Sequence, residues 1–204
     1  MKNEISNHLK TIKNLQIQLN DVKKKKEIET KKPIINVPYS KGNEFNGIIN
    51  YLKSKFNIYN EINITSSSVY QNDQEFAPFN VIKYDDLDAE FHTNDLENSW
   101  ICFEFKNHYI IPKNYTIRSF ALDRNASHLR SWVVEFLNKK NEWEIIDCQN
   151  NCVYLNGRNF TYTFSINNPK NQECKFVRIR QTSENWRDRD FLKINSIEFY
   201  GFIH

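Results

Sequence analysis

The chain has 204 residues, of which 39% are hydrophobic, 14% aromatic and 26% charged. This composition excludes an intrinsically disordered chain, and the length indicates one domain of ordinary size with an appendage. The formal net charge is only +3 and the lysines are densest in residues 1–32, so no nucleic acid is expected as a partner, because a nucleic-acid-binding domain carries a basic surface on its folded part.

Residues 1–32 predict a helix that forms a coiled coil. The apolar residues at the a and d positions of its heptad repeat are Ile5, Ile12, Leu15, Leu19 and Val22. His8 fills one d position, and Pro33 ends the pattern. About three heptads give a coiled coil of marginal stability. We expect a homo-oligomer through residues 1–32, with a helix that lies on its own domain and a fragment of a longer coil as alternatives.

Residues 33–57 are expected to form a connector and a short helix. Pro33 and Pro38 bracket an extended segment, and Asn43 is a candidate for the helix N-cap. The apolar residues that follow with helical spacing are Phe45, Ile48, Ile49, Leu52 and Phe56. One face of this helix is therefore expected to be buried.

Residues 58–204 predict β structure. Short runs rich in β-branched and aromatic residues alternate there with clusters of Asn, Asp, Lys and Pro. The clearest runs are residues 100–105, 115–120, 132–137, 143–146, 160–166, 176–181 and 192–202. Because no helical stretch separates them, the strands are expected to pair in antiparallel fashion, in an all-β sandwich or barrel.

Several motifs follow one another in a particular order along residues 58–203. They are the serines at 66–68, a loop with Ala77, Asp85 and Asp86, WICFEF from Trp100, WVVEFLNKKNEW from Trp132, FVRIRQT from Phe176 and LKINSIEFYG from Leu192. This order resembles the coagulation factor 5/8 type C, or discoidin-like, domain family. The resemblance implies a jelly-roll β-sandwich of about eight strands, of the galactose-binding type.

The positions of the cysteines favour one branch of that family. Extracellular members usually join the two ends of the domain with a disulfide, whereas this sequence has no cysteine before Cys102 or after Cys174. The first residues also lack the apolar core of a signal peptide. We expect a cytoplasmic location and the intracellular branch, whose members accompany coiled coils and act as protein-interaction or substrate-recruiting modules.

Ligands of this family bind to loops at one end of the sandwich, which correspond here to residues 71–80, 88–99 and 120–131. The candidate ligand-binding residues are Asp123, Arg124, Asn125, His128 and Arg130 in the third loop and Trp186 with Arg187 farther along. Planar Arg and Asn groups suit peptide backbone and sugar hydroxyls equally well. An unidentified protein partner is expected, with a glycan as the alternative. The competing interpretation is a surface loop closed by its own hydrogen bonds, with Trp186 covering the core.

Two other groups of side chains leave alternatives open. Phe76 and Phe79 could insert into lipid, but membrane binding is not expected, because their loop has no Lys or Arg for anionic headgroups. The second group consists of Arg118, Arg178 and Arg180, which form either a cationic patch or ion pairs with Glu104, Glu135 and Glu198.

No catalytic signature stands out in the sequence. There is no G-x-S-x-G, no H-E-x-x-H and no phosphate-binding glycine loop, and the whole chain has only 4 glycines. We expect a protein that is not an enzyme, with no cofactor and no metal. Asp85, Asp86 and Asp88 leave a calcium site open as an alternative.

Overall fold

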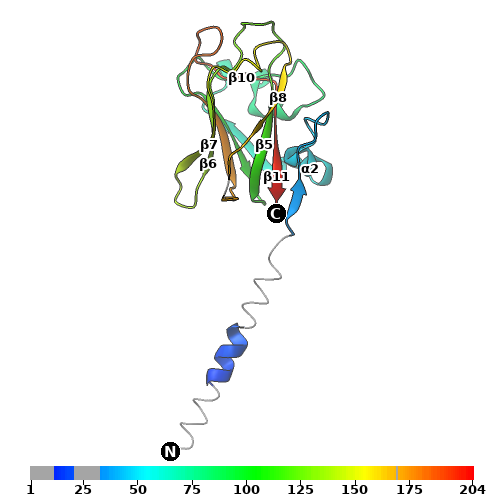
Figure 1. Ribbon diagram of the computed structural model, residues 1–204, viewed down its shortest axis with the longest axis vertical. Coiled ribbons are helices and arrows are strands. Elements are labelled where there is room, and N and C mark those ends of the chain that lie inside the picture. Colours follow the sequence, from blue (N-terminus) through cyan, green and yellow to red (C-terminus); the bar gives the residue numbers. More distant parts are fainter. Residues whose placement is uncertain (1–11, 21–32, 169) are drawn as a thin grey trace, which may run out of the picture. The chain divides into compact units, whose positions relative to one another are not determined.

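The computed structural model describes residues 12–20, 33–168 and 170–204. Ile35–Ile203 form one compact unit (Figure 1). Met1–Ile34 and His204 are assigned to a second unit.

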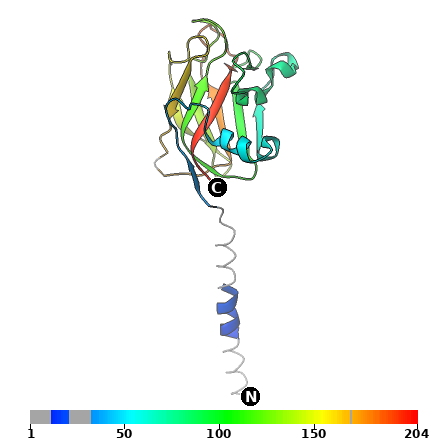
Figure 2. The ribbon, with the colours of Figure 1, turned by 90° about the vertical axis from the view of Figure 1, so that its right-hand side faces the viewer.

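The compact unit is built from two antiparallel sheets that lie face to face (Figures 1 and 2). The four-stranded sheet has the order β1 (Ile35–Val37), β11 (Ser196–Ile203), β5 (Ile110–Arg118) and β8 (Thr161–Ser165). The five-stranded sheet has the order β2 (Ile62–Ser66), β4 (Trp100–Phe105), β9 (Phe176–Gln181), β6 (Trp132–Leu137) and β7 (Trp143–Gln149). A short ladder pairs β3 (Phe91–His92) with β10 (Lys193–Ile194). The predicted all-β sandwich is confirmed, with 11 strands among the described residues.

Apolar side chains at every second position of the strands form the core between the two sheets. Val177 and Ile179 of β9 are fully buried, as their period-2 spacing predicts. Trp132 is also fully buried, and its indole Nε1 donates a hydrogen bond to the Tyr115 hydroxyl at 2.9 Å. That hydroxyl in turn donates to Asp147 at 2.6 Å. The largest aromatic side chain of the core therefore satisfies its single polar atom.

The final predicted strand, residues 192–202, is divided into β10 and β11 at Asn195. This side chain is completely buried, and its Nδ2 donates hydrogen bonds to carbonyl oxygens of the loop 86–89. Its Oδ1 accepts a hydrogen bond from Arg118 Nε at 2.6 Å. Asn195 thus interrupts the strand because it ties a loop to the end of the sandwich.

Helix α2 (Ile48–Lys55) begins after Gly47, and not near Asn43 as predicted. Ile48, Ile49 and Leu52 are fully buried, which confirms the expected apolar face. No side chain near in sequence caps the helix. Instead, the carboxylate of Glu198 on β11 accepts hydrogen bonds from the first N–H groups of α2. The start of the helix is therefore set by a residue far away in the sequence.

Segments before residue 58 contribute to the compact unit. The sequence places residues 33–57 in a connector ahead of a domain that starts at 58, whereas the structure pairs β1 with β11, in the register Ile35↔Ile203. After α2 come α3 (Ile58–Glu61) and the 3-10 turns Tyr70–Asn72, Gln74–Phe76 and Pro78–Ile82. The expected jelly roll thus has β1 and α2 as additional parts.

The structure describes one stretch of the predicted coiled coil. Residues 12–20 are helical, and the side chains of Ile12, Leu15 and Leu19 are exposed. Residues 1–11 and 21–32 lie outside the described residues, so the coiled coil stays a prediction. Among the described residues, none of the helices has the length and apolar character that crossing a bilayer requires.

Candidate functional site

A polar pocket lies at the end of the sandwich where β4 and β6 begin and β9 ends. Its volume is about 350 Å³. The residues that line it are Glu97, Asn98, Arg130, Gln181, Thr182, Ser183, Glu184 and Asp190. This end-loop pocket combines residues of two predicted ligand loops, 88–99 and 120–131, with the segment after β9.

Two buried polar atoms of the end-loop pocket have no hydrogen-bond partner among the described residues. They are Oε1 of Gln181, a residue only 1% exposed, and Nε of Arg130. A buried polar atom left unpaired costs about 1–3 kcal/mol. Neither atom is exposed to solvent, so a ligand that supplies one donor and one acceptor would remove both costs only by displacing the side chains that cover them.

Sequence reasoning missed Gln181, although the strand alternation carries a signal for it. Gln181 shares the core-facing side of β9 with Val177 and Ile179, so it is a polar residue at a position where an apolar one is expected. Its Nε2 donates to the carbonyl oxygen of Arg189 at 3.3 Å, which leaves Oε1 free of partners in the described structure. A polar side chain at such a position is a reason to look for a ligand.

Arg130, which lines the pocket, meets Trp186, which is distant in the sequence and does not line it. The guanidinium carbon of Arg130 lies 5.7 Å from the centre of the Trp186 ring, and Nη1 is 3.6 Å from Asp188. The indole Nε1 donates to the carbonyl oxygen of Cys152 at 3.3 Å. Arg187 is exposed, and its side chain does not line the pocket. Of the seven candidates, the structure therefore brings Arg130, Trp186 and His128 together, since the backbone N–H of Trp186 donates to the carbonyl oxygen of His128 at 3.1 Å.

His128 and Asn125 hold the third loop in shape from within. His128 is completely buried, and its Nε2 lies 2.9 and 3.1 Å from the carbonyl oxygens of Asp123 and Leu122. Burial lowers the pKa of His128, so the ring is neutral and its Nε2 proton is donated to these oxygens. Asn125 and Asn156 exchange two hydrogen bonds. These contacts agree with the competing interpretation of a loop closed by its own bonds.

Asp123 and Arg124 lie outside the end-loop pocket. Asp123 is 3.6 Å from Arg158, and both side chains are exposed. Arg124 is exposed as well. Neither residue shares a contact with Arg130 or Trp186 in the described structure.

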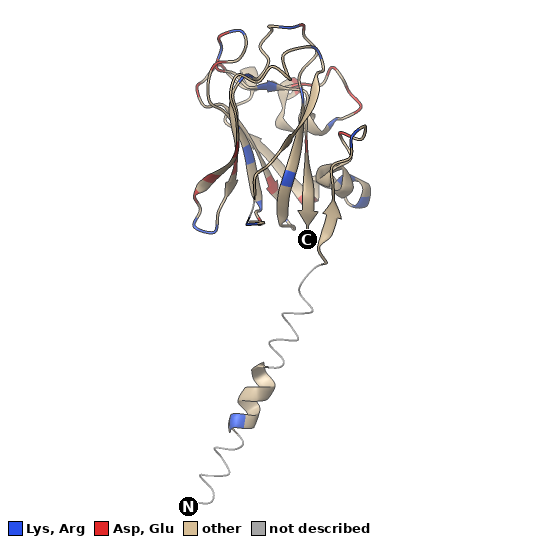
Figure 3. Ribbon diagram, in the orientation of Figure 1, with Lys and Arg blue, Asp and Glu red and all other residues tan. Residues whose placement is uncertain are grey.

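The charges around the pocket are mixed. Figure 3 shows Lys and Arg interspersed with Asp and Glu among the loops at this end of the sandwich. Glu97, Glu184 and Asp190 line the pocket together with one arginine, Arg130. This environment suits neutral polar groups, which can both donate and accept hydrogen bonds, better than it suits anions.

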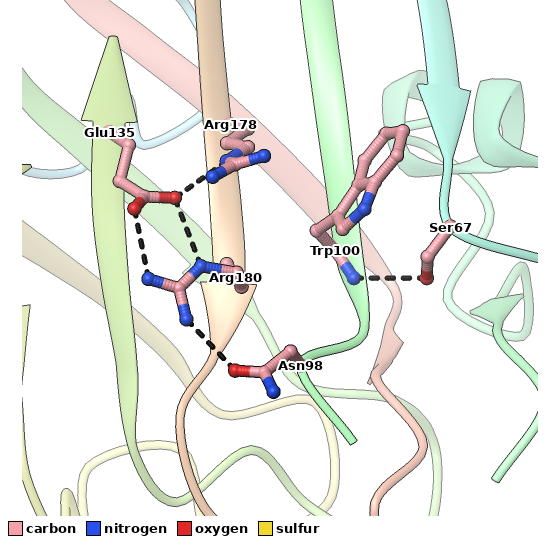
Figure 4. Close-up of polar contacts among 6 residues, drawn as sticks. All are labelled: Ser67, Asn98, Trp100, Glu135, Arg178 and Arg180. Atoms are coloured by element: carbon pink, nitrogen blue, oxygen red, sulfur yellow. Dashed lines mark hydrogen bonds and ion pairs between the residues drawn. The ribbon is translucent and has the colours of Figure 1, made fainter. Parts of the chain in front are cut away.

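On the outer face of the five-stranded sheet, Arg178 and Arg180 form ion pairs. Arg178 Nε lies 2.6 Å from Glu135 Oε2, and Arg180 Nη2 lies 2.9 Å from Oε1 (Figure 4). Burial alone would raise the pKa of Glu135, but hydrogen bonds from the two arginines outweigh it and lower the pKa. Arg118 instead donates to Asn195 and to a backbone carbonyl. The ion-pair alternative is thus observed for two of the three arginines.

The side chains that left lipid insertion and calcium binding open as alternatives have internal partners. Phe76 packs edge-on against Tyr70 at 5.5 Å, and both rings are partly buried. Asp86 Oδ1 accepts hydrogen bonds from the backbone N–H groups of Asp88 and Ala89. In the part of the chain that the structure describes, no cluster of His, Cys, Asp and Glu could hold a metal ion.

A protein-family model described as Sad1 / UNC-like C-terminal matches residues 71–202. This chain belongs to the Sad1 / UNC-like C-terminal family. The matched region extends from the first predicted ligand loop into β11, and it includes every residue that lines the end-loop pocket. The comparison with curated proteins found no match.

Solved structures show the same fold as this Sad1/UNC-like domain. The F5/8 type C domain of a Bacteroides fragilis protein is 13% identical, with a TM-score of 0.54 over 68% of this chain and 90% of that one. The Clostridium perfringens domain CpGH89CBM32-5, in complex with GalNAc-β-1,3-galactose, is 14% identical, with a TM-score of 0.52 over 68% and 94%. The fucolectin of striped bass (Morone saxatilis) serum is 16% identical, with a TM-score of 0.52 over 69% and 47%. These similarities confirm the predicted discoidin-like fold, and they establish the fold alone.

Proposed function

We propose that this Sad1/UNC-like domain is a non-enzymatic module that binds a protein partner through the end-loop pocket. The observation that carries the proposal is the pair of unpaired buried atoms, Gln181 Oε1 and Arg130 Nε. A peptide backbone supplies one N–H donor and one C=O acceptor per residue, which is the complement that these two atoms need once the side chains that cover them move.

We also propose that the chain is located in the cytoplasm and that its N-terminal helix forms multimers. All four cysteines are free, in keeping with a reducing compartment. The described part of the helix leaves Ile12, Leu15 and Leu19 exposed, so their side chains are available to a second copy. Joining several weak pockets in one oligomer would raise the apparent affinity for a multivalent partner.

A displayed library of short peptides tests the pocket. Peptides selected on the full chain are measured against Gln181→Leu and Arg130→Met, which remove the acceptor and the donor. Each change is expected to weaken binding about tenfold, the effect of losing one hydrogen bond of about 1.4 kcal/mol. Arg124→Ala, an exposed arginine outside the pocket, is the matched control. If the selected peptides bind Gln181→Leu as tightly as the unchanged chain, the pocket is not their site.

A glycan is the second candidate ligand. The Clostridium perfringens domain of the same fold is described in complex with a galactose-containing disaccharide, and sugar hydroxyls can also donate to Gln181 and accept from Arg130. A glycan array separates the two candidates. A glycan that binds the unchanged chain and is lost in Gln181→Leu, with no peptide selected at the pocket, would replace the protein proposal.

A further inference from the structure

The face of the five-stranded sheet that points away from the core carries large apolar side chains. They are Trp100, Leu137, Trp143, Ile145 and Phe176. Cross-strand pairing places Trp100 beside Arg180, Leu137 beside Trp143, and Ile145 beside Glu135. Ile145 is 58% exposed, and the other four are partly buried. These residues, together with Arg178 and Arg180, are termed the outer sheet face.

A carboxylate is buried at the centre of the outer sheet face. Glu135 is only 3% exposed, although it lies on the side away from the core. Both of its oxygens are occupied by guanidinium nitrogens, with Arg178 Nε at 2.6 Å and Arg180 Nε and Nη2 at 3.2 and 2.9 Å (Figure 4). The remaining nitrogen of Arg180, Nη1, donates to Asn98 at 3.0 Å. Two guanidinium groups thus share one buried carboxylate, while a second carboxylate, Glu104 of the neighbouring strand β4, lies partly exposed on the same face.

Arg178 has N–H donors that are not used by the ion pair with Glu135. It reaches Glu135 through Nε, and no hydrogen-bond partner of its Nη1 or Nη2 occurs among the described residues. Its guanidinium carbon lies 4.0 Å from the centre of the Trp143 ring, so the group contacts both an aromatic ring and the carboxylate of its ion pair. Two parallel donors in a fixed plane match the geometry of a carboxylate.

We propose that the outer sheet face docks a segment of a partner protein in which one Asp or Glu is flanked by aliphatic or aromatic residues. The acidic side chain accepts two hydrogen bonds from Arg178 Nη1 and Nη2. The apolar neighbours pack on Trp143, Ile145 and Trp100, and exclude water from the ion pair. Charge complementarity selects the acidic residue, and Trp and Arg are the residue types that contribute most to protein interfaces.

The side chains proposed to bind at the outer sheet face differ from those proposed to bind in the end-loop pocket. Asn98 lines the pocket and its side chain also accepts a hydrogen bond from Arg180. Gln181, which carries the proposed function, points to the core side of β9, whereas Arg178 and Arg180 point to the other side. Substitutions at Gln181 and at Ile145 therefore report separately on the two sites.

The test uses the full chain and two libraries of short displayed peptides. One library has a central Asp or Glu among aliphatic and aromatic residues, and the other has Asn or Gln at the same position. We expect only the acidic library to yield binders. Their affinity should fall about tenfold or more for Ile145→Asp, which adds a negative charge to the face, and should stay within about twofold for Gln181→Leu. Raising the salt concentration should weaken the same peptides.

Arg178→Gln is the second variant, and it removes the proposed donors directly. Thermal melting shows whether it folds without the pairing to Glu135, and Ile145→Asp decides the test if it does not, because that side chain is exposed. Equal selection from both libraries, or unchanged affinity in Ile145→Asp, would overturn the proposal. So would sedimentation showing that Ile145→Asp dissociates an oligomer, since the face would then be covered by a second copy.

Discussion

The buried carboxylate of Glu198 accepts a hydrogen bond of 2.9 Å from the backbone N–H of Ile49, across 149 positions of sequence. Its other oxygen accepts from Asn50 and Gly47 at 2.9 and 3.2 Å. The first turn of a helix has N–H groups without helical partners, and a negative charge is favourable there. One side chain of the last strand therefore caps α2 and fixes it to the four-stranded sheet.

Replacing Glu198 with Leu should lower the free energy of unfolding by about 2–5 kcal/mol, because several buried N–H groups lose their acceptor. Urea denaturation followed by circular dichroism measures the change. Glu104→Gln is the control, since Glu104 is partly exposed and makes one long hydrogen bond of 3.4 Å, to Asn63. Equal denaturation midpoints for the Leu variant and the unchanged chain would contradict the capping role.

Glu198 should also make stability depend on pH. Burial raises its pKa from 4.5 to about 7, against the lowering effect of the hydrogen bonds from Asn50, Ile49 and Phe199. Between pH 4.5 and 7 the folded chain thus binds a proton that the unfolded chain releases, so this contribution to stability is present at low pH and is lost as the pH rises through 7.

The measurement compares the unchanged chain with Glu198→Gln, which cannot titrate, at about pH 5.5 and about pH 8. The stability advantage of the unchanged chain should be about 2 kcal/mol larger at the lower pH. The buried histidines titrate in both proteins, and their contributions cancel in the difference. An advantage that is the same at both pH values would show that Glu198 stays ionised throughout.

His128→Ala should destabilise the third loop. The imidazole holds the carbonyl oxygens of Leu122 and Asp123 from within, and its removal leaves a cavity beside Phe120, so a loss of about 2–4 kcal/mol is expected. Hydrogen exchange of residues 122–126 should accelerate. Arg124→Ala, in the same loop but exposed, should change neither quantity. A stable His128→Ala protein with weaker ligand binding would instead assign His128 to the binding site.

Leu15→Glu with Leu19→Glu should prevent self-association. Both side chains are exposed in the described helix, and charges at a and d positions oppose coiled-coil packing. Sedimentation velocity should show an oligomer for the unchanged chain and a monomer for the double variant, with the same melting temperature of the β-sandwich. A monomeric unchanged chain would end the coiled-coil hypothesis.

The sequence could predict the strands because their side chains alternate. Trp100–Phe105, Trp132–Leu137 and Phe176–Gln181 end where the pattern places them, since each has one apolar face that must be buried. The pairing of β1 with β11 could not be predicted, because three residues carry too little pattern. The start of α2 was predicted wrongly, since the group that caps it is Glu198 and not a neighbour in sequence.

The candidate site was predictable only in part, for a similar reason. Arg130 and Trp186 stood out as planar groups in loops, but their contact with each other depends on the fold. The alternation of β9 marks Gln181 as a polar residue on the apolar side of the strand, but its unpaired Oε1 is visible only in the folded structure. The burial of His128 likewise depends on contacts within the folded loop, and loop residues of the same polarity can point in or out.

The pairing of Ile35 with Ile203 has a practical consequence for engineering. The chain enters and leaves the compact unit at neighbouring strand ends of one ladder (Figure 1). These strand ends lie at the end of the sandwich away from the end-loop pocket. Such a unit can be inserted as a module into a surface loop of another protein, or closed into a ring by a short linker. In either form the loops that make up the pocket face outward and stay free of the junction.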